Sequence, residues 1–253
     1  MASRLQRWFG RTAEVPLLDN WSVRCHPICV GEFSVFQSDL EQKQELRAFS
    51  RLATRSMQFL DIGTHWGVFT LAALYLGGPK ARVIAIEASR EAAGILRDNL
   101  LLNAADEHVT IINAACSETD GQIQMLTTGA GGAGYYVPTE SPRSDSISVP
   151  SFTADTIVAH HSFCPTHMKV DVEGCELEVL QGAKSTLANH RPILFLELHG
   201  DLLRKRQRSP EEVLRHLTKL GYRHWEGFDG RQISLPDLAS ARFNVRFVAR
   251  YSA

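Results

Sequence analysis

Short apolar runs alternate with helical segments from residue 57 onward, and this alternation is the feature that most constrains the fold. Five of the runs are nearly continuous in apolar residues: MQFLDIG, ARVIAIEA, HVTIINAA, HMKVDVEG and RPILFLELH. Such runs are typical of parallel strands buried on both faces, because the connecting helices cover both sides of the sheet. We therefore predict an α/β fold with a doubly wound, mostly parallel sheet. Ligands bind such sheets beyond the carboxyl ends of the strands, so we expect functional residues just after each run.

The segment before this alternation has a different character. The 253 residues suit one large α/β domain with an extension, and we place the boundary between residues 1–56 and residues 57–253. Within the extension, Trp21–Phe36 has the composition of strands, whereas Asp39–Thr54 carries apolar residues at helical spacing. We expect the extension to contribute to a substrate site or a lid.

Three later segments complete the predicted elements. The string GQIQML could form an added strand, and CELEVLQGAKSTLA is predicted to form a helix. The span Thr127–Pro150 is rich in glycine, serine and proline, which predicts a loop that could cover a site. The final run FNVRFVARY is strand-like, and we expect it at an antiparallel edge of the sheet.

Composition excludes several classes of protein. The formal net charge is -1, so nothing indicates a general electrostatic interaction with nucleic acid. No apolar stretch reaches the roughly 18 residues that a membrane-spanning helix needs. The five cysteines are scattered and odd in number, which favours reduced thiols in the cytoplasm over a disulfide framework. We expect a cytoplasmic protein without a membrane span, and the sequence leaves its oligomeric state open.

A glycine turn follows the first predicted strand, in the string DIGTHWG. Gly63 allows a tight turn that brings a ligand close to the backbone, and Gly67 lies where the next helix begins. The spacing D-x-G-x-x-x-G differs from the G-x-G-x-x-G that binds a dinucleotide pyrophosphate. Asp61 beside the turn would repel a phosphate but would suit a cationic ligand. An ordinary structural turn is the alternative.

Glu87 follows the second predicted strand, in the string VIAIEAS. A carboxylate a little over 20 residues past a glycine turn can accept hydrogen bonds from both hydroxyls of a ribose. A solvent-exposed residue next to a helix start is the alternative. The turn upstream favours the ribose interpretation.

Acidic residues follow the fourth and fifth strands. Asp171 and Glu173 lie two residues apart, and Glu197 and His199 repeat that spacing after the next strand. Because we expect the two strand ends to be neighbours, three carboxylates and an imidazole would converge. A structural account is also open, since Lys169 could pair with Asp171, or Glu173 could cap the next helix. We predict that the remaining acids of this region, Glu176 and Glu178, lie on the surface of that helix.

The strings DIGTHWG and IEAS resemble the nucleoside-binding half of S-adenosylmethionine-dependent methyltransferases. KVDVEGCELEVLQGA, with FTADTIV before it and FLELH after it, is similar to the FkbM family of methyltransferases over about residues 40–225. The resemblance implies a seven-stranded Rossmann-like sheet and O-methylation of a hydroxyl on a sugar, a natural product or another small molecule. One departure is that Thr64-His65 stands where the family usually carries Ala-Asn. The implied cofactor residues are Asp61, Gly63, Thr64, His65, Gly67, Glu87 and Ala88.

Methylation of an alcohol gives the acidic residues a use, because a base that removes the hydroxyl proton typically contributes about 10²–10⁴-fold. Asp171 would lie beside the cofactor or act as the base, with His199 as the alternative base. Glu173 and Glu197 would bind the substrate hydroxyl. The same groups could hold a divalent metal ion, a use that the sequence does not favour.

Two other functions remain open at this point. Because of Thr64-His65, the domain could be a nucleoside-binding partner subunit that has lost catalysis. A nicotinamide-dependent oxidoreductase would share the fold class, although the glycine spacing disfavours it. Amino-group methylation of nucleobases is disfavoured too, since Asp171-Val172-Glu173-Gly174 stands where such enzymes carry an Asn/Asp-Pro-Pro-aromatic string. We therefore expect a small-molecule or carbohydrate substrate and not a nucleic acid.

Overall fold

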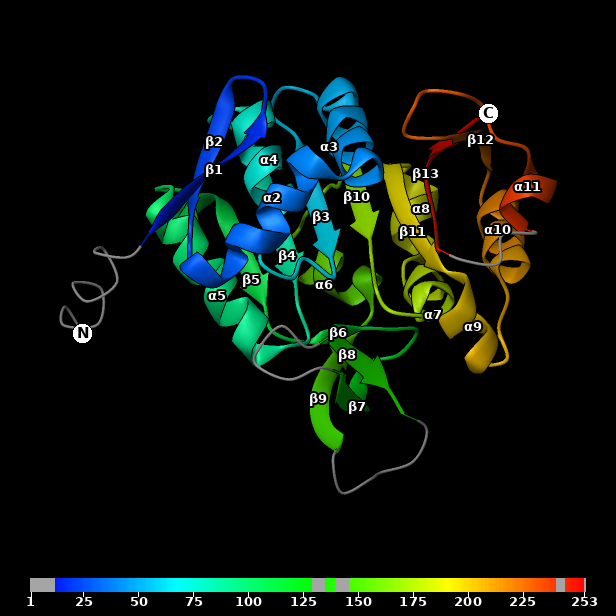
Figure 1. Ribbon diagram of the computed structural model, residues 1–253. Helices are drawn as coiled ribbons and strands as arrows, with labels where there is room; N and C mark the ends of the chain where they lie inside the picture. The colour runs from blue at the N-terminus through cyan, green and yellow to red at the C-terminus, as the bar shows by residue number, and fades with distance from the viewer. Residues whose placement is uncertain (1–11, 129–134, 140–145, 240–243, 253) are drawn as a thin grey trace.

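A seven-stranded sheet runs through the middle of the protein (Figure 1). The computed structural model describes residues 12–128, 135–139, 146–239 and 244–252. From one edge to the other the strands are β12 (Tyr222–Glu226), β13 (Asn244–Tyr251), β11 (Ile193–His199), β10 (His167–Val170), β3 (Gln58–Ile62), β4 (Arg82–Ile86) and β5 (Val109–Ile112).

The five strands from β11 to β5 are parallel, and β13 runs antiparallel between β11 and β12. The predicted doubly wound, mostly parallel α/β fold is thus confirmed. The final strand, β13, was predicted to lie at an edge of the sheet. This prediction was wrong, because β12 pairs with the side of β13 that faces away from β11. The chain moves outward from β3 to β5 and then crosses to β10, so the strand order switches between β3 and β10. Ligand sites of open α/β sheets lie at such a switch.

Helices cover both faces of the sheet, each over its own apolar core. Successive residues of a strand point to opposite faces, so Phe59 packs into one core and Leu60 into the other. The first core lies under α2 (Val30–Ser38), α3 (Leu40–Leu52), α4 (Val68–Gly77) and α5 (Arg90–Leu102). The second lies under α6 (Ala154–His160), α7 (Glu176–Gln181), α8 (Lys184–His190), α9 (Gly200–Lys205), α10 (Pro210–Lys219) and α11 (Leu235–Ala239). No helix in the described ranges has the length and apolarity to cross a membrane.

The predicted helix over residues 175–188 is two helices, α7 and α8. They meet at Gly182, where a Cβ atom would lie 2.0 Å from the main-chain oxygen of Ser117. The helix thus ends where another loop approaches its backbone closely. A glycine inside a helical pattern is the sequence signal for such an approach.

The extension is partly helical where strands were predicted. A hairpin of β1 (Ala13–Leu18) and β2 (Trp21–Cys25) precedes a short 3₁₀ helix, Pro27–Cys29. The rest of the segment predicted as strand is α2, because Phe33 and Phe36 lie one helical turn apart and both enter the first core. Tertiary packing here overrides the strand-like composition. The predicted helix over 39–54 is confirmed as α3.

The segment 127–150 was predicted as a loop, and its described parts are instead mainly strands. They belong to a small four-stranded sheet in the order β6 (Ala115–Cys116), β9 (Ser146–Phe152), β7 (Gly121–Thr128) and β8 (Tyr135–Pro138). Val149 and Ser151 alternate as buried positions in β9, a strand signal that the serine and proline content obscured. Residues 129–134 and 140–145 lie outside the described chain. The small sheet lies below the ends toward which β3 and β10 point (Figure 1).

Candidate functional site

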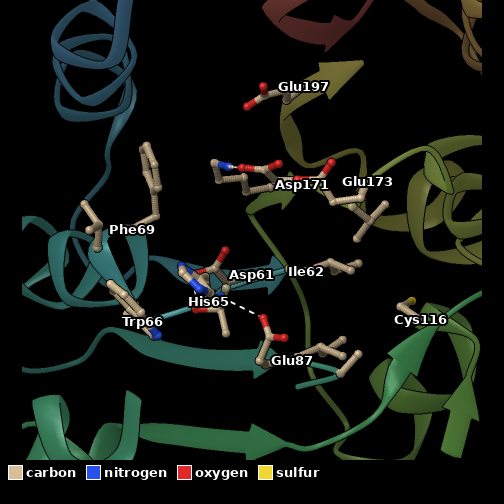
Figure 2. Close-up of a pocket in the computed structure, with 18 of the residues that line it drawn as sticks. Asp61, Ile62, His65, Trp66, Phe69, Glu87, Cys116, Asp171, Glu173 and Glu197 are labelled. Atoms are coloured by element: carbon tan, nitrogen blue, oxygen red, sulfur yellow. Dashed lines mark hydrogen bonds and ion pairs between the residues drawn. The ribbon is translucent and has the colours of Figure 1, made fainter. Parts of the chain in front are cut away.

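A cavity of about 460 Å³ opens at the carboxyl ends of β3, β4, β10 and β11. Its volume lies within the range of about 300–1,000 Å³ that is usual for small-molecule sites. Asp171, Glu173 and Glu197 gather at one end of the cavity, and Glu87 lies at the other (Figure 2). Every residue predicted from the sequence to bind cofactor or to act in catalysis lines this cavity.

The glycine turn is shaped by close packing. Gly63 has φ +80°, and a Cβ atom on it would lie 1.8 Å from the main-chain oxygen of Asp171. Only glycine therefore lets the turn after β3 approach the end of β10. Gly67 has φ +91° and precedes α4, where a Cβ atom would lie 2.3 Å from Cδ1 of Leu96. The two glycines are fixed by geometry whether or not a ligand is bound.

Glu87 is 9% exposed and is held by two main-chain donors. The N–H of His65 donates to its Oε2 at 2.8 Å (Figure 2). The N–H of Ser89 donates to its Oε1 at 2.8 Å. Burial raises the pKa of Glu87, although these hydrogen bonds and the charge of His65 oppose the rise. Each oxygen keeps a second lone pair for a ligand.

His65 connects the turn to the N-terminal extension. Its Nδ1 lies 2.8 Å from Oε1 of Glu32 on α2, and its ring stacks on Trp66 with centroids 4.4 Å apart. Burial would lower the pKa of His65, but the hydrogen bond to Glu32 and the charges of Glu32 and Glu87 outweigh it and raise the pKa. Glu32 was missed from the sequence, because nothing local to α2 marks its partner 33 residues away.

Asp61 lies at the base of the cavity and is only 1% exposed. Its Oδ2 accepts hydrogen bonds from the hydroxyls of Thr64 at 2.9 Å and Thr70 at 2.6 Å. Burial raises the pKa of Asp61, and the two hydroxyls and the charge of Lys169 oppose the rise. Thr64 thus stabilises the acid of the turn.

Two cations sit among the acidic residues: Lys169 is buried and Arg246 is partly buried. Nζ of Lys169 lies 2.5 Å from Oδ2 of Asp171 and 3.6 Å from Oε1 of Glu45, a residue of α3. Nε of Arg246, on β13, lies 2.7 Å from Oε2 of Glu197. The pairing of Lys169 with Asp171 that the sequence left open is therefore present. Glu45 and Arg246 were missed, because they come from segments distant in sequence.

Glu176 and Glu178 are not surface residues of α7, as predicted, but are buried, at 0% and 6% exposure. Oε1 of Glu176 lies 2.7 Å from Nδ1 of His199, whereas Oε1 of Glu178 accepts a hydrogen bond from Arg206 at 3.0 Å. A buried carboxylate is costly unless it is paired, and each has a cationic or protonatable partner.

The remaining ring nitrogen of His199 faces three carboxylates. Nε2 lies 3.5 Å from Oε1 of Glu197, 3.8 Å from Oε2 of Glu173 and 3.9 Å from Oδ1 of Asp171. Burial would lower the pKa of His199, but the hydrogen bond to Glu176 and the surrounding negative charges raise it to about 9. His199 without a ligand is therefore protonated at neutral pH, which makes it a poor base.

The carboxyl groups of Asp171 and Glu173 differ in basicity. Burial would raise the pKa of Asp171, but the charges of Lys169 and His199 hold it below its usual value. Burial raises the pKa of Glu173, which outweighs the effect of His199. Glu173 is also 26% exposed and makes no hydrogen bond to the described residues. Of the two, Glu173 is the better proton acceptor.

The other end of the cavity is apolar and was not predicted from the sequence. It is lined by Ile62, Ala88, Ala114, Cys116, Ile123 and Met125, the last three from the small sheet. Burial raises the pKa of the Cys116 thiol to about 12, so it remains neutral. Trp66 also lines the cavity, is 3% exposed, and has an indole N–H without a partner in the described chain.

With this geometry established, similarity to known proteins becomes informative. The family model of the methyltransferase FkbM domain matches residues 61–224, which is well over half of the chain. The chain belongs to the FkbM methyltransferase family. The match begins at Asp61 and contains Glu87, Asp171, Glu173, Glu197 and His199.

Two solved structures resemble this FkbM family member in fold. The methyltransferase FkbM of Methylobacillus flagellatus KT has a TM-score of 0.53 at 19% identity, and the match covers 79% of this chain and 47% of that one. A proposed rRNA methylase from Clostridium thermocellum has a TM-score of 0.50 at 11% identity, covering 84% and 96%. This chain therefore spans about half of the FkbM structure it matches. No curated protein gives a significant match.

Proposed function

We propose that the protein is an S-adenosylmethionine-dependent O-methyltransferase that acts on a hydroxyl of a sugar, a natural product or another small molecule. The observation that carries the proposal is the convergence of Glu87, Asp171, Glu173 and Glu197 on one cavity at the strand-order switch of a methyltransferase-family fold.

The cavity has the chemistry that S-adenosylmethionine requires. Glu87 has free lone pairs beside the glycine turn for the two ribose hydroxyls, and the apolar end suits an adenine ring. When bound, the cofactor supplies a methyl group on a positively charged sulfur. The excess of carboxylates at the opposite end would favour that charge.

The acidic end would hold the methyl acceptor. We assign the role of base to Glu173, which would take the hydroxyl proton at Oε2 as the new C–O bond forms. Asp171 and Glu197 are held by cations and would orient the acceptor rather than accept its proton. Alignment of the reacting atoms can supply about 7–11 kcal/mol, so these fixed carboxylates matter as much as the base.

Residues 12–56 would complete the acceptor side of the site. Glu32, Val35 and Phe36 of α2 line the cavity, as do Gln42 and Glu45 of α3. This placement supports a role of the extension in acceptor selection, since Glu45 pairs with Lys169 at the acidic end, whereas Glu32 contacts His65 of the glycine turn.

The test is transfer of an isotope-labelled methyl group from S-adenosylmethionine to a panel of monosaccharides, glycosides, polyols, phenols and amines. We expect one class of hydroxyl to be labelled. Glu173→Gln should lower kcat by about 10²–10⁴-fold while leaving the affinity for S-adenosylhomocysteine unchanged. Glu211→Gln, on the exposed face of α10, is the control.

Labelling of nitrogen instead of oxygen would contradict the proposal. Tight binding of S-adenosylhomocysteine without transfer to any acceptor would support the alternative of a nucleoside-binding partner subunit.

A further inference from the structure

We propose that Asp171, Glu197 and His199 form a binding site for a divalent metal ion at the acceptor end of the cavity. The ion's catalytic use rests on the proposed function, whereas its binding does not.

The three side chains present their donor atoms to one small space. Oδ1 or Oδ2 of Asp171, a carboxylate oxygen of Glu197 and a ring nitrogen of His199 lie within 4.8 Å of one another. Ligands around an ion at about 2.0–2.3 Å are separated by roughly 3–4.5 Å, depending on whether they are adjacent or opposite. The spacing therefore matches the first coordination shell of one ion.

His199 is the observation that points to an ion rather than to a mere acidic cluster. The residue is 5% exposed, and its Nε2 donates to none of the described residues, lying 3.5–3.9 Å from all three carboxylates that face it. A protonated imidazole would gain most by moving to hydrogen-bond distance of one carboxylate. Nε2 instead lies 3.5–3.9 Å from all three, a spacing that an ion shared between the imidazole and the carboxylates would account for.

A buried carboxylate fixes the orientation of this imidazole. Oε1 of Glu176 lies 2.7 Å from Nδ1, and Glu176 is completely buried. Hydrogen bonding at Nδ1 leaves the lone pair of Nε2 directed at the three carboxylates. Metal-binding histidines almost always donate their second N–H to a carboxylate, a carbonyl or a water in this way.

The cluster of side chains around His199 carries more negative than positive charge. Lys169 and Arg246 are its permanent cations, and each already occupies one oxygen of a carboxylate: Oδ2 of Asp171 and Oε2 of Glu197. The other oxygens, Oδ1 and Oε1, are the ones that face His199. The five carboxylates of Glu45, Asp171, Glu173, Glu176 and Glu197 outnumber Lys169, Arg246 and a protonated His199, so a divalent ion that displaces the proton of His199 would reduce the excess negative charge.

The donor set selects the kind of ion. Two carboxylates and one imidazole suit Mn²⁺ and Zn²⁺ better than Ca²⁺, which prefers six to eight oxygens. Three protein ligands leave positions for an acceptor hydroxyl or a pair of neighbouring hydroxyls. An ion there would lower the pKa of a bound hydroxyl and place it beside Glu173, the proposed base.

The test measures the binding of Mn²⁺, without any other ligand, to the 253-residue protein after treatment with a chelator. Binding is followed by the loss of the six-line electron paramagnetic resonance signal of free Mn²⁺. We expect saturable binding of one ion per chain. His199→Ala and Glu197→Gln should abolish it, and Glu176→Gln should weaken it by about 10–100-fold. Glu178→Gln is the matched control, since Glu178 is a buried acid of the same helix that pairs with Arg206, and its variant should bind as the wild type does.

Circular dichroism establishes that each variant is folded. A second measurement uses the wild-type protein and so does not depend on whether a variant folds. In it, Mn²⁺ should selectively broaden the imidazole resonances of His199. No binding at millimolar Mn²⁺, or binding that His199→Ala and Glu197→Gln leave unchanged, would overturn the site. Calorimetry with S-adenosylhomocysteine on the same metal-free sample separates the two proposals: nucleoside binding without Mn²⁺ binding refutes only the metal site, and the reverse refutes only the methyltransferase.

Discussion

The main-chain N–H of His65 donates to Oε2 of Glu87 at 2.8 Å, so the turn after β3 and the acid after β4 hold each other in place. The turn is also fixed against β10, where Gly63 approaches the main chain of Asp171. These contacts join the ends of three neighbouring strands before any ligand is bound. Changes in this region should therefore affect both stability and ligand affinity.

Gly63→Ala tests the packing of the turn. A Cβ atom there meets the main-chain oxygen of Asp171 at 1.8 Å, and φ +80° is unfavourable for alanine. We expect a loss of roughly 3 kcal/mol or more in the free energy of unfolding, measured by urea denaturation. Gly94→Ala in α5 is the control: its Cβ atom meets nothing within 4 Å, and we expect a gain of about 0.5–1 kcal/mol. Equal effects of the two changes would contradict the packing argument.

Glu32→Gln tests the contact between the extension and the turn. The pKa of His65 is raised in the folded state, so the stabilisation by its charged form is complete below pH 6.5 and is lost as the pH rises through the raised value. The side chains are 15% and 33% exposed, so we expect a loss of only about 0.5–1 kcal/mol at pH 6. At pH 9 the loss should be smaller. Urea denaturation at both pH values checks this, with exposed Glu14→Gln as control, and a loss independent of pH would contradict it.

Lys169→Met tests the buried ion pairs. Lys169 is 3% exposed and lies between Asp171 and Glu45, with its Nζ 4.8 Å from the ring centroid of Phe69. Removing one partner of a buried pair leaves charge uncompensated and typically costs about 3–5 kcal/mol. Thermal and urea denaturation should show such a loss in the free energy of unfolding. The control Lys184→Met, at an exposed position, should change the free energy of unfolding by no more than about 0.5 kcal/mol. A change in Lys169→Met as small as the control's would show that the acids do not depend on this cation.

The sequence was sufficient for the parts of the fold set by periodicity. The five parallel strands and the helix α3 follow from apolar patterns in the sequence. Where local composition competed with packing, the predictions were wrong: α2 has strand-like residues, and β9 has the serines and proline of a loop.

The candidate site was predictable where residues directly follow strands, because parallel strands bring their carboxyl ends together. This rule placed Glu87, Asp171, Glu197 and His199 correctly at one cavity. It could not find Glu32, which reaches the cavity from the extension. Glu176 was wrongly predicted to lie on the surface, because its burial depends on its partner His199, 23 residues further along the chain.

The most direct test of the central claim is calorimetric titration of the protein with S-adenosylhomocysteine. Binding to one site per chain is expected, weakened at least about 10-fold by Glu87→Ala, since a hydrogen-bonded carboxylate typically contributes about 1.5–3 kcal/mol. Glu91→Gln, an exposed acid four residues further along, should leave the affinity unchanged. Absence of heat at millimolar ligand, or equal affinity in Glu87→Ala and the wild type, would contradict the account.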